Sequence, residues 1–195
     1  MRLEDLPPGY EEALHFRVTK GSTMLWLNLM AVVMLLVFLV IFLGWLAVYH
    51  ALGGVLVFDA LPDEIGTLPG LALVLLILPL HELTHGMFIA RYGHKPTYGI
   101  KLMKGVLYAT ADGALFRRNE YAAVAMAPFV VISLVLLALS LIVPAGIAVW
   151  LMFAATINAT GAVGDFWMTY KTLQYPPDSL VLDVEDGMRI FARTA

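Results

Sequence analysis

Four long runs of apolar residues alternate with shorter polar segments along the chain. The runs cover residues 24–49, 68–91, 121–143 and 147–169, and only a Pro144-Ala145-Gly146 turn separates the last two. Each run is long enough to cross about 30 Å of hydrocarbon as an α-helix. The pattern therefore predicts an all-α polytopic membrane protein with four transmembrane helices.

The segment between the second and third runs follows a different pattern. Three short stretches, residues 98–103, 106–110 and 114–116, favour β-strands. Lys104-Gly105 and Asp112-Gly113 are typical of the turns between such strands. We therefore expect a small β-hairpin or sheet to join the two helices.

Composition explains where so many apolar residues can go. Hydrophobic residues make up 61% of the 195 residues and charged residues 14%, against about 45–50% and 25% in an ordinary soluble domain. A water-soluble globule of this size would expose too large an apolar surface, so the lipid bilayer must act as part of the solvent. The length fits a single domain, residues 1–195. The net charge of -3 argues against nucleic acid as a partner, and the absence of cysteine excludes disulfides and thiolate metal sites.

The distribution of basic residues predicts an orientation in the membrane. All twelve lysines and arginines lie in the N-terminal segment, in the central loop (about 92–120, with Arg91 at its border) or in the tail (about 170–195). The connections at residues 50–67 and 144–146 contain none. By the positive-inside rule, both termini and the central loop are expected on the cytoplasmic side of the cell membrane.

A few strongly polar residues interrupt the apolar runs, and each charged one costs about 2.5–3.5 kcal/mol to insert. His81, Glu82 and His85 form an HExxH motif in the second run. The two histidines are four residues apart, so both imidazoles share one helix face and can bind one zinc ion. A catalytic zinc lowers the pKa of its water to about 7, and Glu82 would then be the general base. A histidine pair that ligates haem and a polar cluster that packs helices remain alternatives.

Asp165, in the fourth run, is the candidate third ligand. It lies about four residues before the cytoplasmic end of its run and His85 about six before the matching end, so their depths are similar. Asn158 lies seven residues before Asp165 on the same helix face, which suits a substrate-binding group or a hydrogen-bond partner of a ligand. An interfacial carboxylate that reaches water is the alternative for Asp165. Histidines outside the runs are expected to be ordinary surface or interfacial residues: His15, His50 and His94.

Two further features have two interpretations each. Pro79 and Pro128 predict kinks, either near the metal site or of the routine kind in membrane helices. The predicted sheet could bind an unwound substrate by adding a strand to an open edge, or it could be a plain hairpin whose basic residues contact anionic headgroups.

The motifs together resemble the DUF3267 zincin peptidase family, which looks like a compact branch of the site-2 protease class of intramembrane zinc metalloproteases. The resemblance is carried by HELTHG at 81–86, by Ala127-Pro128, by the stretch 158–165, by Leu6-Pro7-Pro8-Gly9-Tyr10 and by the tail sequence 183–187. It implies zinc at His81, His85 and Asp165, with Glu82 as general base.

We therefore expect zinc-dependent hydrolysis of a peptide bond in a membrane-protein or peptide substrate, within or near the membrane. A non-catalytic scaffold or chaperone with a structural metal site is the first alternative. A small transporter or proton relay through His81, Glu82 and Asp165 is the second, but the first and third runs offer almost no polar lining for a path. Another divalent ion is possible at imidazole and carboxylate ligands, so zinc is an inference from ligand type.

Overall fold

A computed structural model of the protein describes residues 1–17, 22–53, 66–101, 106–184 and 187–193. The helices are α1 (Ser22–Ala51), α2 (Thr67–Arg91), α3 (Arg118–Ser140), α4 (Ala145–Gly161) and α5 (Val163–Leu173), and a short 3-10 helix covers Leu3–Asp5. The strands are β1 (Tyr10–Arg17), β2 (Thr97–Lys101), β3 (Val106–Thr110), β4 (Leu115–Arg117), β5 (Leu180–Val184) and β6 (Gly187–Arg193). The described residues are therefore mostly helical, as predicted, with more β-structure than an all-α protein has.

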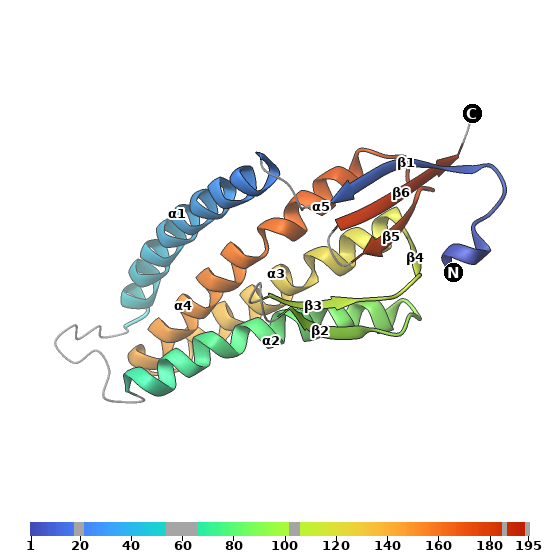
Figure 1. Ribbon diagram of the computed structural model, residues 1–195. Helices are drawn as coiled ribbons and strands as arrows, with labels where there is room; N and C mark the ends of the chain where they lie inside the picture. The colour runs from blue at the N-terminus through green and yellow to red at the C-terminus, as the bar shows by residue number, and fades with distance from the viewer. Residues whose placement is uncertain (18–21, 54–65, 102–105, 185–186, 194–195) are drawn as a thin grey trace.

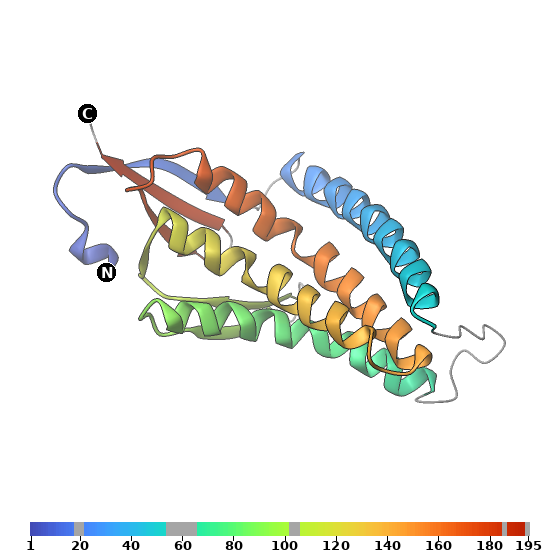
Figure 2. The ribbon, with the colours of Figure 1, turned by 180° about the vertical axis from the view of Figure 1, so that it is seen from behind.

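The long helices lie side by side along one axis, the four-stranded sheet lies at one end, and β2 and β3 lie alongside α2 (Figures 1 and 2). α2, α3 and α4 pack against one another, and α1 packs on α4. By length and composition α1, α2 and α3 could each cross a membrane, and α4 with α5 could form a fourth, bent span. Most apolar side chains of α1 face outward, as lipid contact requires; Leu43, for example, is 63% exposed.

The fourth predicted span, residues 147–169, is not one straight helix. The helix is interrupted at Ala162, and α4 and α5 meet at an angle of 44°. Gly161 and Gly164 flank the break, and glycine is a weak helix former because it has the most backbone freedom to lose. This interruption of the helix places Asp165 in the first turn of α5.

The tail, about residues 170–195, is an integral part of the fold. β5 and β6 form the centre of a four-stranded antiparallel sheet with the order β1-β6-β5-β4. Val181, Met188 and Ile190 are fully buried in a cluster with Tyr121 and Val124 of α3. The tail sheet therefore packs directly on the helix ends near the candidate site.

The central loop forms strands where the sequence predicted them, but they do not make one sheet. β2 and β3 pair as an antiparallel hairpin, with Tyr98 opposite Ala109. The third predicted strand becomes β4 and pairs with β5 of the tail instead. Asp112-Gly113 is a turn, as expected, whereas the predicted Lys104-Gly105 turn lies outside the described residues.

Candidate metal centre

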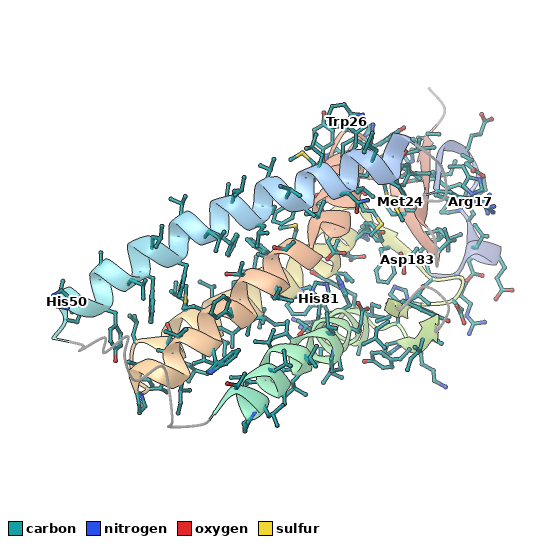
Figure 3. All side chains as sticks on the ribbon, turned by 60° about the vertical axis from the view of Figure 1, so that its left-hand side comes forward. Arg17, Met24, Trp26, His50, His81 and Asp183 are labelled. Atoms are coloured by element: carbon teal, nitrogen blue, oxygen red, sulfur yellow. The ribbon has the colours of Figure 1, made fainter. Side chains whose placement is uncertain are left out.

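α2 presents two histidines on its inner face. His81 and His85 are one helical turn apart, and their ring centroids are 4.9 Å from each other. Leu83, between them in sequence, points away and is 47% exposed. The helix is therefore amphipathic at this point, with its polar residues turned toward α3 and α5 (Figure 3, where His81 is labelled).

Asp165 of α5 faces both rings, as the sequence predicted. Its Oδ2 atom is 3.1 Å from His81 Nε2, and its Oδ1 atom is 3.5 Å from His85 Nε2. One ligand atom from each of the three residues lies within 4.8 Å of the others. Tetrahedral zinc with bonds of 2.0–2.1 Å separates its ligands by about 3.3 Å, so the spacing and the donor set both fit a divalent metal ion.

The remaining ring nitrogen of each histidine also has a partner. Asn158 Oδ1 lies 3.1 Å from His81 Nδ1, and the backbone oxygen of Val124 lies 2.9 Å from His85 Nδ1. Both partners are acceptors, so these contacts assign a proton to each Nδ1. Each Nε2 is then left with its lone pair for a metal, which is the arrangement that outer partners of metal-binding histidines impose.

Asn158 is itself held in place and is 2% exposed. Its Nδ2 group donates to the backbone oxygen of Pro128 at 3.2 Å and to Ser133 Oγ at 3.3 Å, both on α3. Of the two roles that the sequence left open, the contacts favour the partner of a ligand, because the side-chain oxygen already meets His81.

Glu82 adjoins the three donors and contacts the hairpin. The backbone N–H of Ala109 on β3 donates to its carboxylate. The hairpin can approach α2 closely because Gly86 has no side chain, and a Cβ there would overlap the hydroxyl of Tyr98. β3 thus lies beside the HExxH helix and fixes the proposed general base.

A second acidic residue, Asp183 of β5, lies near the metal donors and outside the spanning helices. Tyr121 Oη donates to Asp183 Oδ1 at 3.3 Å, and the Thr110 hydroxyl donates to the same carboxylate. Burial raises the pKa of Asp183 to about 6. In Figure 3 Asp183 lies between the sheet and His81. It therefore connects the tail to α3 and to the strand that holds Glu82.

The other polar candidates lie elsewhere. His15 is on β1, His50 is in the last turn of α1 at the opposite end of the molecule (Figure 3), and His94 packs its ring on Phe116. Glu120 caps α3 by accepting the Arg117 backbone N–H at 2.9 Å. Among the described residues, these side chains do not join the group formed by His81, His85 and Asp165.

A comparison with protein families gives the site a context. The model of the family DUF3267, described as "Putative zincin peptidase", matches residues 74–180, which is just over half of the chain. The chain belongs to the DUF3267 family. The matched region of this DUF3267 protein contains the HExxH helix, the hairpin, Asn158 and Asp165. No curated protein and no solved structure matches the chain.

The family description and the three donor residues are both consistent with a metal site. A zincin peptidase binds zinc and hydrolyses peptide bonds, and the DUF3267 chain carries two imidazoles and a carboxylate where zinc would need them.

Two backbone groups at this centre, the Ala109 N–H and the Val124 carbonyl, were not predicted from the sequence. Backbone groups leave no mark in composition or spacing. Only Pro128 gave a signal, because a proline within a helix removes the hydrogen bond to the carbonyl four residues earlier.

Proposed function

We propose that the protein is a zinc-dependent endopeptidase, similar to the site-2 protease class, that hydrolyses a peptide bond within or next to the membrane. The observation that carries the proposal is the position of Glu82, adjacent in sequence to His81 and beside a set of three metal donors contributed by two helices. A merely structural metal site would not need a carboxylate next to it.

The metal would be held by His81 Nε2, His85 Nε2 and a carboxylate oxygen of Asp165. When bound, zinc supplies a Lewis acid that polarises the substrate carbonyl and makes water acidic enough to attack at neutral pH. The choice of zinc over another divalent ion follows from the imidazole and carboxylate donors together with the family description.

Glu82 moves the proton. Its carboxylate accepts a proton from the attacking water and then donates it to the amide nitrogen as the C–N bond breaks. The Ala109 N–H keeps this carboxylate in one orientation. Asn158 serves as a positioning residue, because its oxygen accepts from His81 and its amide donates to α3.

The hairpin supports an extended substrate. In an antiparallel ladder, neighbouring residues point their backbone groups to opposite sides. The Ala109 N–H points to Glu82, so the backbone groups of Leu107 and Ala109 lie on the β3 edge that faces α2. A substrate strand that pairs with Leu107 on this edge, next to the Ala109 N–H that holds Glu82, would expose its carbonyls to the site, whereas a helical substrate hides them.

The position of the centre supports cleavage near one membrane face. His85 lies six residues before Arg91, which is about 9 Å along the helix axis. The segments of the described residues that contain most of the lysines and arginines, including β1, β4 and β6, lie at this same end of the helices. We assign this end to the cytoplasm by the positive-inside rule.

The test combines metal analysis with cleavage of a single-span membrane peptide in mixed micelles. Glu82→Gln is expected to keep one zinc per chain and to lose about 10²- to 10⁴-fold in cleavage rate, which is the usual contribution of general acid–base catalysis. Glu11→Gln, the same change on the exposed strand β1, is the control and should cleave like the wild type.

Three results would contradict the proposal. Wild-type protein without stoichiometric metal would remove its basis. Full cleavage by Glu82→Gln would exclude the general-base role. If zinc is bound but no substrate is cleaved by the wild type, the non-catalytic scaffold becomes the better explanation.

A further inference from the structure

Pro128 lies inside α3 and changes the hydrogen bonding of that helix. Proline has no backbone N–H, so residue 128 cannot donate to the carbonyl four residues earlier. That carbonyl belongs to Val124. The Val124 oxygen therefore lacks its usual partner within the helix.

The released carbonyl faces the candidate metal centre. His85 Nδ1 lies 2.9 Å from the Val124 oxygen, and both residues are buried, at 8% and 6% exposure. A buried carbonyl without a donor costs free energy, so the imidazole N–H supplies the bond that Pro128 removes. The bond also fixes the ring so that Nε2 points toward Asp165.

Pro128 reaches the other histidine through its own carbonyl. That oxygen accepts from Asn158 Nδ2 at 3.2 Å, and Asn158 Oδ1 lies 3.1 Å from His81 Nδ1. Pro128 is thus connected to both histidines of α2. It reaches His81 through its own carbonyl and Asn158, and it reaches His85 through the Val124 carbonyl that it releases.

We propose that Pro128 is a positioning residue for the metal ligands, and that its missing N–H makes the Val124 carbonyl available to His85. This role goes beyond a routine kink in a membrane helix. It rests on the proposed function only in that a metal is held by His81, His85 and Asp165, and it does not depend on peptide cleavage.

Two variants at position 128 distinguish the effect of the missing N–H from the effect of the proline ring. Pro128→Ala restores an N–H that competes for the Val124 oxygen, and zinc affinity should fall about 10-fold, at the low end of the effect of removing an outer partner of a ligand. Replacing Pro128 by lactic acid removes both the ring and the N–H, since an ester oxygen takes the place of the nitrogen. This ester variant should bind zinc within about 2-fold of the wild type.

Pro79→Ala is the matched control, because Pro79 also lies inside a helix of the same bundle. Its zinc affinity should stay within about 2-fold of the wild type. Competition with a chromophoric chelator in micelles measures all four affinities and needs no substrate.

A spectroscopic readout follows His85 itself. In the zinc-loaded wild type labelled with ¹⁵N-histidine, the His85 Nδ1–H should give a slowly exchanging proton signal. Pro128→Ala should shift this signal and speed its exchange with water, whereas the ester variant should keep it.

Several outcomes would overturn the proposal. Equal losses in Pro128→Ala and the ester variant would show that the ring or the kink matters. An unchanged affinity in Pro128→Ala, or an equal loss in Pro79→Ala, would also exclude the role, as would a wild type that binds no zinc. Affinities that follow the prediction, with no cleavage of any substrate, would instead contradict the proposed function and leave this role intact.

Discussion

At the scale of single residues, the centre depends on how each imidazole is fixed. A metal ligand binds well only when its lone pair already points to the metal, because orienting a free ring costs entropy. Here His81 meets a side-chain amide and His85 meets a backbone carbonyl. The two histidines are therefore open to different tests, since only the amide can be removed by a simple substitution.

Asn158→Ala should weaken zinc binding by about 10- to 100-fold, because His81 Nδ1–H loses its acceptor and the ring can rotate. Asn158→Asp keeps an acceptor oxygen and should bind more tightly than the alanine variant. The measurement is again chelator competition in micelles.

Thr160→Ala provides the control on the same helix. The Thr160 hydroxyl donates only to the backbone of its own helix, at Thr156 O, in the contacts of the described residues. Its zinc affinity should match that of the wild type. Wild-type affinity in Asn158→Ala would show that the contact with His81 does not orient the ring.

The sequence predicted the three donors because their chemistry is local or periodic. Two histidines at a spacing of four share a helix face wherever they occur, and Asp165 could be matched to His85 by depth. The direction in which Asn158 points could not be predicted. It depends on how α3 and α4 pack, and spacing within one helix contains no information on that packing.

At the scale of elements, the sequence predicted the structures that depend on local patterns and missed those that depend on partners distant in sequence. Long apolar runs specify helices by themselves, so α1, α2 and α3 lie where they were expected. β5 and β6 were missed although they pair with each other, and each also needs an outer partner, β4 or β1, that is distant in sequence. The bend at Ala162 depends on two glycines that a hydropathy average hides.

The junction of β5, β3 and α3 should make stability depend on pH through Asp183. Burial raises the pKa of Asp183 from 3.8 to about 6. The hydrogen bonds from Thr110 and Tyr121 and the charge of His85 lower this pKa, whereas the charge of Asp165 raises it further. The folded state then binds more protons than the unfolded state between about pH 4 and pH 6. Stability should fall as the pH rises through this window, by up to about 3 kcal/mol, and should level off above it.

The Asp183→Asn variant isolates this contribution because asparagine is neutral at every pH. The Tm of the variant minus the Tm of the wild type should be larger at pH 7.5 than at pH 4.5, on the order of 5 °C. Both proteins are melted in micelles with a chelator present. Asp178→Asn, the same change at an exposed position, should show a difference that does not depend on pH. Parallel pH curves for wild type and Asp183→Asn would contradict the prediction.

At the scale of the whole molecule, the distribution of lysines and arginines agrees with the directions of the helices. α1, α2, α3 and the bent pair α4–α5 alternate in direction, so the N-terminal segment, the hairpin and the tail meet at one end (Figure 1). Every lysine and arginine lies in or next to these segments. The arrangement therefore divides the molecule into an end whose segments contain the lysines and arginines and an end whose connections contain none, as an asymmetric membrane environment requires.

This division predicts a labelling pattern, and the chain is well suited to the test because it contains no cysteine. Glu11→Cys and Asp178→Cys place single thiols at the sheet end, and Leu52→Cys and Ile142→Cys place them at the other end, where the native side chains are 71% and 79% exposed. In intact bacterial cells, a membrane-impermeant maleimide should label positions 52 and 142 only. Positions 11 and 178 should react after the membrane is permeabilised.

The four probes also decide how α4 and α5 sit in the bilayer. If the bent pair crosses as one span, positions 142 and 178 react on opposite sides of the membrane. If it enters and returns on one side, which a 44° break also allows by length and composition alone, both positions react together. In that case the tail would lie on the opposite side of the membrane from the N-terminal segment, and the pairing of β6 with β1 could not form.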